Sequence, residues 1–193
     1  MRKTLAFLSV LLLGFSSIAY STQTIVFIRH GEKPNNDSGQ LTCKGLNRAL
    51  ALPDVLISNF GKPDALFASA PKQNKLGSSL RAVQTITPTA VKVSLPIHLN
   101  YHAGETNELQ KALLSKQYEN SVIFIAWEHD NLVKAAKSIM KSEGANPDEI
   151  PKWQGSDFDS IYILRINRDN GSKIITFEHM QQGLNNVSEQ CPN

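Results

Sequence analysis

The sequence is short of several features that would point to common classes of function. Its 193 residues contain no glycine-rich nucleotide-binding loop, no internal repeat and no low-complexity run. The 20 basic residues stand against 17 acidic ones and do not gather into a basic stripe, which a general nucleic-acid-binding or membrane-surface function would need. We therefore expect no nucleic-acid partner, and any specificity for anions must be local.

Cysteine is scarce as well, because Cys43 and Cys191 are the two in the chain. So few thiols argue against a metal site, and we expect neither a metal nor another cofactor. In an exported protein, two cysteines far apart in sequence indicate one disulfide that ties the C-terminal tail to the early part of the fold. Two free thiols are the alternative, because a sequence does not show whether the sulfur atoms meet.

An apolar run near the N-terminus, residues 5–15, is too short for a comfortable membrane span. Arg2 and Lys3 precede this run, and the small residues Ser17, Ala19 and Ser21 follow it. The pattern predicts a cleaved signal peptide over residues 1–21, with cleavage after Ala19 or Ser21. An uncleaved anchor or a buried first strand is the alternative. The prediction implies a periplasmic or secreted protein with no membrane association after cleavage.

Residues 22–193 would then form the mature chain, which is long enough for one domain with a substantial core but short for two. Loss of Arg2 and Lys3 leaves 18 basic residues against 17 acidic ones, so the mature chain is nearly neutral. Strands and helices alternate up to about residue 140, and the Arg-Asp-Asn-Gly sequence at 168–171 indicates a hairpin. We expect an α/β protein: a single-domain three-layer α/β/α fold with a mainly parallel sheet and a C-terminal antiparallel hairpin.

Two prolines and one polar stretch give local expectations. Pro53 is expected to start a second helical piece, since proline fits a first turn better than a helix interior. Pro88 is expected to end or kink a later helix for the same reason. The polar residues 72–77 are expected to form a flexible connection that brings Lys72 and Lys75 near the mouth of a pocket, where both are interpreted as solvated loop lysines.

The most informative stretch is residues 24–33. The apolar, β-branched residues 25–28 predict a buried strand that ends on Arg29, His30 and Gly31, and such strand ends are where α/β proteins place their chemistry. Arg29 is a permanent cation suited to phosphate or carboxylate, and its charge disfavours protonation of His30. We therefore expect a neutral imidazole facing a bound anion, with Gly31 permitting close approach of the ligand. A purely structural Arg-His pair is the alternative.

Arg29-His30-Gly31-Glu32 resembles the signature of the histidine phosphatase superfamily, the phosphoglycerate-mutase-like proteins. Further parts of that family's pattern follow in order: Leu41, Thr42, Gly45 and Ala49, then Ser79, Arg81-Ala82 and Gln84-Thr85, then His129 at a predicted strand end. The resemblance covers nearly the whole mature chain and implies the family's α/β fold. It also implies that His30 is phosphorylated during turnover and that Glu32 orients the arginine cluster. The phosphate-binding residues that it implies are Arg29, Arg81 and His129.

The resemblance leaves the proton donor open among three carboxylates. Glu105 is favoured, because the phosphoglycerate-mutase-like branch places its donor after the corresponding strand. Asp130 is a close rival, because His129-Asp130 resembles the His-Asp pair of the acid-phosphatase branch, and Glu128 is third. Four possible metal ligands lie close together in the sequence: His98, His102, Glu105 and Glu108. Because their spacing does not match a helical metal-binding histidine pair, we do not expect a metal site there.

Together the residues predict a phosphoric monoester hydrolase that acts on small phosphorylated substrates through a phosphohistidine. The enzyme would be a metal-independent histidine phosphatase, because the protein's own cations would neutralise the phosphoryl oxygens. A non-catalytic phospho-ligand-binding protein on the same fold is the alternative. A phosphoglycerate-type mutase ranks third, because an exported protein does not meet the supply of phosphorylated metabolites that a mutase needs. His179 is interpreted as structural.

Overall fold

The computed structural model describes residues 21–36, 38–74, 77–169 and 171–192. The predicted signal peptide lies outside these residues except for Ser21, which is the first residue of a strand. Within the described part of the chain, no helix has the length and apolar character to cross a membrane.

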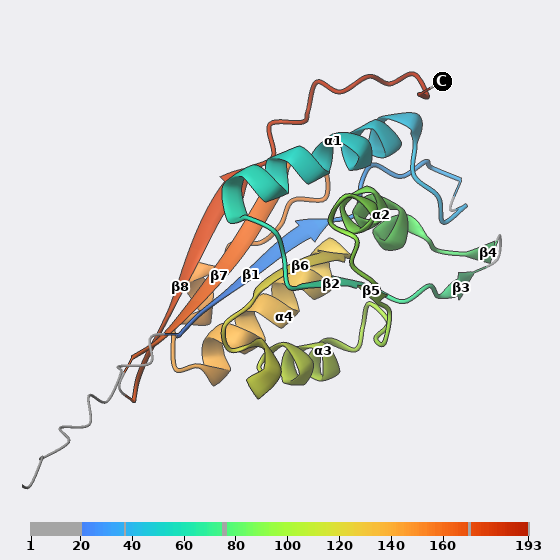
Figure 1. The fold of residues 1–193 in the computed structure, drawn as a ribbon. Helices are drawn as coiled ribbons and strands as arrows, with labels where there is room; N and C mark the ends of the chain where they lie inside the picture. The colour runs from blue at the N-terminus through green and yellow to red at the C-terminus, as the bar shows by residue number, and fades with distance from the viewer. Residues whose placement is uncertain (1–20, 37, 75–76, 170, 193) are drawn as a thin grey trace, which may run out of the picture.

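A mixed sheet of six strands forms the middle layer of the molecule (Figure 1). Its strands are β1 (Ser21–Arg29), β2 (Ala65–Ala68), β5 (Ile97–His98), β6 (Val122–Trp127), β7 (Ser160–Asp169) and β8 (Ser172–Gln181). The first four are parallel and lie in the order β5, β2, β6, β1, and the antiparallel pair β7 and β8 continues the sheet beside β1. The predicted parallel sheet with a C-terminal hairpin is confirmed.

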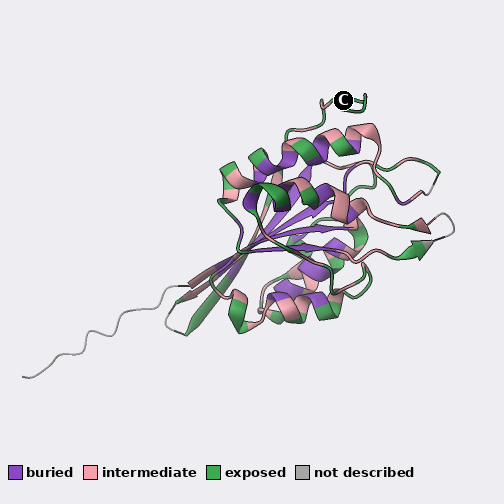
Figure 2. Cartoon of the chain, turned by 45° about the vertical axis from the view of Figure 1, so that its right-hand side comes forward, coloured by how far each residue is buried: buried purple, intermediate pink, exposed green. Residues whose placement is uncertain are grey.

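Helices cover both faces of this sheet (Figure 1). They are α1 (Cys43–Phe60), α2 (Arg81–Val93), α3 (Thr106–Leu113) and α4 (His129–Ser142), with short 3₁₀ turns at Lys116–Tyr118 and Pro147–Glu149. Side chains alternate along β1, so that Val26 and Ile28 pack with α1 and α2 while Ile25 and Phe27 pack with α3 and α4. Figure 2 shows the resulting buried strands between two layers of half-exposed helices. This arrangement explains why β6 and residues 25–28 of β1 are continuously apolar.

Both prolines lie inside continuous helices, so the two expected interruptions are wrong. Pro53 is buried within α1, which shows no second start, and α2 runs through Pro88 as far as Val93. Leu52 and Leu56 are fully buried on the face of α1 that meets the sheet. We infer that burial on both sides of the proline outweighs the loss of one backbone hydrogen bond.

The polar stretch before α2 is a small hairpin and not a wholly irregular connection. β3 (Gln73–Asn74) pairs antiparallel with β4 (Gly77–Ser78). The backbone N–H of Ser79 donates to the carbonyl oxygen of Lys72 at 3.0 Å, an ordinary hydrogen-bond length. Lys75, which was expected near the pocket mouth, lies outside the described residues.

The predicted disulfide between Cys43 and Cys191 is confirmed, with Cα atoms 4.4 Å apart. The C-terminal tail therefore runs along the start of α1 (Figure 1). The side-chain amide of Asn47 donates to the carbonyl oxygens of Ser188 at 2.8 Å and Gln190 at 2.6 Å. The tail is thus fastened by one covalent bond and by two hydrogen bonds from the Asn47 side chain to the backbone on either side of Glu189.

Candidate active site

The candidate site lies where the chain leaves β1 and β6, which are neighbouring parallel strands. Arg29 pairs with Trp127 at their carboxyl ends, and the backbone N–H of His30 donates to the carbonyl oxygen of Trp127 at 3.0 Å. After β1 the chain continues into α1 on one face of the sheet, and after β6 it continues into α4 on the other face. Divergence of this kind is where open α/β sheets form ligand sites, and His30 directly follows β1 while His129 is the first residue of α4.

His30 is 5% exposed, and its ring is held in one tautomer. Nδ1 lies 2.8 Å from the carbonyl oxygen of Gly31. Because a carbonyl can only accept, Nδ1 carries the proton and Nε2 keeps its lone pair. Burial is the main cause that lowers the pKa of His30 to about 4; the charges of Arg81 and Arg29 act in the same direction, and the hydrogen bond to Gly31 opposes the shift. At neutral pH the ring is therefore an uncharged nucleophile.

Arg29 is fixed by the loop that precedes β7. Its Nη1 donates to the carbonyl oxygens of Gly155 at 2.8 Å and Asp157 at 2.9 Å, and its guanidinium carbon lies 3.9 Å from the centre of the Phe158 ring. Burial lowers the pKa of Arg29, although Glu128 and other carboxylates oppose this shift. Its Nε is buried and has no hydrogen-bond partner among the described residues. A buried donor without a partner is costly, which indicates that a ligand supplies the acceptor.

Arg81, the first residue of α2, is tied to the loop after β1 through the hydroxyl group of Thr85. The backbone N–H of Gly31 donates to Oγ1 of Thr85 at 2.9 Å, and Thr85 Oγ1 donates to the carbonyl oxygen of Arg81 at 2.7 Å. Nε of Arg81 is also buried and unpartnered within the described part of the chain. The carboxyl end of the sheet thus brings the Nε–H groups of Arg29 and Arg81 near the uncharged ring of His30.

Two glycines allow α1 to touch the loop that carries His30. A Cβ atom on Gly31 would lie 2.9 Å from the carbonyl oxygen of Gly45, and one on Gly45 would lie 2.6 Å from that of Glu32. The backbone N–H of Thr42 also donates to the Glu32 carbonyl at 2.8 Å, while Thr42 Oγ1 caps α1 by accepting from the Gly45 N–H. The Leu-Thr-x-x-Gly sequence therefore caps α1 and also lets the backbone of α1 touch the backbone of the loop after His30.

Glu128 has a structural task, which weakens its candidacy as a proton donor. Its carboxylate caps α4 by accepting from the backbone N–H groups of Asp130 at 3.1 Å and Asn131 at 3.0 Å. Oε1 also lies 2.6 Å from Nδ1 of His129, without the alignment of a hydrogen bond. Glu128, His129 and Asp130 bring possible metal-ligand atoms within 4.8 Å of one another. Since both oxygens of Glu128 already accept N–H groups, we assign the Glu128 carboxylate to helix capping and not to a metal site.

The two other donor candidates lie in different cavities, one on each side of the first turn of α4. A cavity of about 570 Å³ is lined by Glu105 and Asn131, and a second of about 440 Å³ is lined by Asp130. Oε2 of Glu105 accepts the backbone N–H of His102 at 2.6 Å. Asp130 is exposed, and Oδ1 lies 3.9 Å from Nε2 of His129. The structure thus brings both carboxylates to the carboxyl end of the sheet, but not into one pocket.

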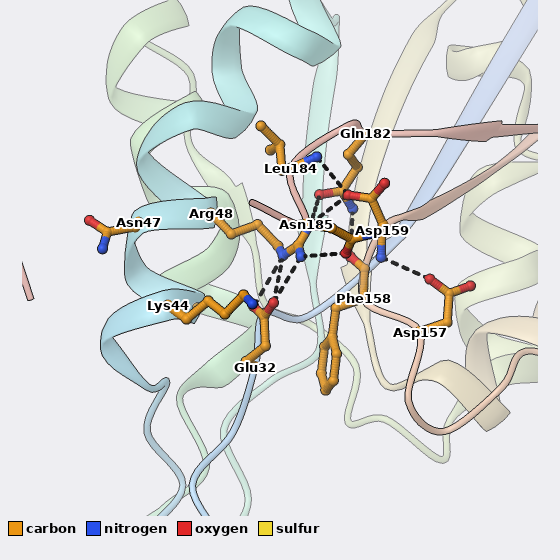
Figure 3. Close-up of polar contacts among 12 residues, drawn as sticks. Glu32, Lys44, Asn47, Arg48, Asp157, Phe158, Asp159, Gln182, Leu184 and Asn185 are labelled. Carbon is orange, nitrogen blue, oxygen red and sulfur yellow. Dashed lines mark hydrogen bonds and ion pairs between the residues drawn. The ribbon is translucent and has the colours of Figure 1, made fainter. Parts of the chain in front are cut away.

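The arginine that binds Glu32 is Arg48, which was not predicted from the sequence (Figure 3). Arg48 is 1% exposed, donates to Glu32 at 2.8 Å and to Asp159 at 2.8 Å, and also reaches Gln182 and Asn185. Burial alone would lower the pKa of Arg48, but its hydrogen bonds to the two carboxylates raise it. Glu32 therefore orients the loop after His30 through α1, and not through contact with Arg29 or Arg81.

A signal for Arg48 is present in the sequence. It occupies a position on the buried stripe of α1, which also contains Gly45, Leu52 and Leu56. A charged residue on such a stripe needs a buried partner. The pairing with Asp159 could not be read in the same way, because the two residues are 111 positions apart.

No known family model matches the sequence, and no curated protein matches it either. Solved structures do match. A protein histidine phosphatase, SixA, complexed with tungstate has a TM-score of 0.55 at 16% identity, over 82% of this chain and 97% of the other. Phosphoglycerate mutase from Bacillus anthracis has a TM-score of 0.52 at 13% identity, over 85% and 95%. This chain has the phosphoglycerate-mutase-like fold.

A phosphoserine phosphatase mutant from Entamoeba histolytica, in complex with phosphoserine, shares the phosphoglycerate-mutase-like fold with a TM-score of 0.51 at 16% identity, over 84% of this chain and 98% of the other. The fold implied by the resemblance of Arg29-His30-Gly31-Glu32 is therefore confirmed. The roles of individual residues are argued from this chain alone.

Proposed function

We propose that the chain hydrolyses phosphomonoesters and that Nε2 of His30 is the nucleophile. The observation that carries this proposal is the hydrogen bond from His30 Nδ1 to the Gly31 carbonyl oxygen, together with the buried Nε atoms of Arg29 and Arg81, which have no partner among the described residues. A lone pair directed at an oxyanion held by arginines is the arrangement for in-line attack on phosphorus.

The reaction has two steps. In the first, Nε2 forms a bond to phosphorus, the bond from phosphorus to the leaving oxygen breaks, and a carboxylic acid gives that oxygen a proton. In the second, the resulting carboxylate takes a proton from water, the water oxygen attacks phosphorus, and the bond to Nε2 breaks. Arg29, Arg81 and His129 hold the phosphoryl oxygens in both steps. The guanidinium groups of Arg29 and Arg81 supply the charge stabilisation that the proposed chemistry requires without a metal.

Two related structures support this reading by their ligands. The SixA structure contains tungstate, an oxyanion, and the phosphoserine phosphatase contains phosphoserine. The substrate proposed for this chain is likewise a small phosphorylated molecule. A phospho-ligand-binding protein without turnover would use the same cations, so measured turnover separates the two functions.

The nucleophile is tested by trapping the phosphorylated protein. Purified protein is mixed with an aryl phosphate, quenched in alkali, which preserves phosphohistidine, and analysed by mass spectrometry of its peptides. We expect one phosphoryl group on the peptide that contains His30, and His30→Asn should lose both the label and nearly all turnover. His179→Asn, at an exposed position on β8 that lines neither of the two cavities, is the matched control. Near-normal turnover of His30→Asn would exclude a covalent route through this residue.

For the proton donor we propose Glu105, because it lines the larger cavity with Asn131, whereas Asp130 lines the other. An alkyl alkoxide needs protonation as it leaves, but nitrophenolate does not. Glu105→Gln should therefore slow an alkyl phosphate about 10²–10⁴-fold more than nitrophenyl phosphate. Glu108→Gln, in the first turn of α3, is the control. If Asp130→Asn shows the leaving-group dependence and Glu105→Gln does not, the assignment moves to Asp130.

We also propose that the chain is exported and matured by removal of residues 1–21 or a slightly shorter segment. The disulfide between Cys43 and Cys191 supports this proposal, since disulfides persist in oxidising compartments. Cell fractionation with N-terminal sequencing of the recovered protein tests it, and a protein that keeps Met1 in the cytosol would contradict it.

A further inference from the structure

The cavity of about 570 Å³ contains residues that are close in sequence to Arg81 and His129, two residues of the proposed phosphate site. Ser79 lines the cavity two residues before Arg81, and Asn131 lines it two residues after His129. The volume is within the range of sites for whole small molecules and exceeds what one phosphoryl group requires. A phosphomonoester held by Arg81 and His129 would therefore project its alcohol portion into this space.

Hydrogen bonds fix the walls of the cavity. Nε1 of Trp127 donates to the carbonyl oxygen of Ala103 at 2.9 Å, and the backbone N–H of Ala70 donates to the carbonyl oxygen of Tyr101 at 2.7 Å. These bonds tie one wall, the loop before α3, to the ends of β6 and β2. Lys72 and Ser79, which flank the β3–β4 hairpin, also line the cavity, and the Ser79 N–H donates to the Lys72 carbonyl oxygen at 3.0 Å. The space is thus formed before any ligand binds.

Three titratable side chains line the cavity: Lys72, His102 and Glu105. The Glu105 carboxylate is engaged by the backbone of its own loop. Lys72 forms no ion pair with any residue for which the structure describes side chains. The lining therefore offers one cation to a group on the alcohol portion of the substrate, beyond the cations at the phosphoryl group.

We propose that this cavity is the leaving-group subsite and that Lys72 binds a carboxylate on the alcohol, so that the preferred substrates are phosphorylated hydroxy acids. The inference rests on the proposed phosphomonoesterase function. Lys72 is a specificity-determining residue in this view and takes no part in the bond-breaking steps. An exposed ion pair contributes modestly and a charge-assisted hydrogen bond more, so loss of Lys72 should reduce discrimination about three- to tenfold.

The test compares phosphoglycolate with its methyl ester, which lacks the negative charge on the alcohol portion. The measured quantity is the ratio of kcat/KM for the acid to kcat/KM for the ester, in wild type and in variants. Intrinsic reactivity of the two esters is the same for every variant and cancels. Lys72→Met should lower the ratio about three- to tenfold, Lys72→Glu should lower it further, and Lys72→Arg should preserve most of it.

Lys92→Met is the matched control, because Lys92 is an exposed lysine on α2 that pairs with Asp54 outside the cavity. An unchanged ratio in Lys72→Met, or an equal loss for both substrates, would overturn the proposal. Calorimetry on His30→Asn, with and without Lys72→Met, gives the corresponding ratio of the Kd values for the acid and the ester. Absence of turnover with every ester would refute the proposed hydrolysis, and the Kd ratio would still decide whether Lys72 recognises the carboxylate.

Discussion

Burial of uncharged His30 should make the stability of the protein depend on pH in a way that one substitution removes. The pKa of His30 is about 4 in the folded state against 6.5 for an ordinary histidine. Between these values the unfolded chain binds a proton that the folded chain does not, so stability falls as the pH falls from about 6.5 to about 4. From pH 7 to pH 5, His30 alone should cost about 2 kcal/mol of unfolding free energy.

Urea unfolding of wild type and His30→Asn at several pH values between 4.5 and 7.5 measures this effect. Asparagine can still donate to the Gly31 carbonyl oxygen but does not titrate. The difference between the two unfolding free energies should therefore change by about 2 kcal/mol between pH 7 and pH 5, while contributions common to both proteins cancel. Leu56→Ala, which removes buried apolar surface but no titrating group, should lower the unfolding free energy by a similar amount at every pH. Parallel curves for wild type and His30→Asn would refute the reasoning that desolvation holds His30 uncharged.

Three further predictions concern the supports of the site. Arg48→Met should cost about 3–5 kcal/mol in denaturant unfolding, because it leaves Glu32 and a second buried carboxylate without their cation; a loss below 1 kcal/mol would contradict that role. Gly45→Ala should lower phosphatase activity more than it lowers the melting temperature, since the added methyl group meets the Glu32 carbonyl oxygen, and Leu46→Ala, at an exposed position beside it, is the control. Replacing Cys43 and Cys191 with serine should cost about 3–5 kcal/mol, measured by unfolding without reductant, because the bond closes a loop of 148 residues.

Local sequence patterns were sufficient to predict that His30 and His129 lie at the carboxyl ends of buried strands. The apolar residues before His30 and before Glu128 are buried on both faces of the sheet, and such a run is typical of a central strand covered by helices on both sides. Its carboxyl end is then a place for chemistry. The order of the motifs was readable because each one coincides with a boundary between a strand and a helix.

Long-range partners could not be read in this way. Pro53 and Pro88 were expected to interrupt helices because local propensity disfavours them, and tertiary burial reversed that preference. Arg48 forms contacts with residues from the segments after β1 and around β7 and β8. No local rule predicts that these segments meet. The same holds for the two sides of α4, which separate Glu105 from Asp130.

The disulfide has a consequence for a chain that has been cut. Cleavage of one peptide bond anywhere between Cys43 and Cys191 would give two fragments that remain covalently joined. A cut after β2 would leave β1 and β2 on one fragment and β6 on the other, and β6 lies between them in the sheet. The fragments would then interleave as well as share a bond. Proteolytic nicking would therefore be invisible on a non-reducing gel and would appear only after reduction.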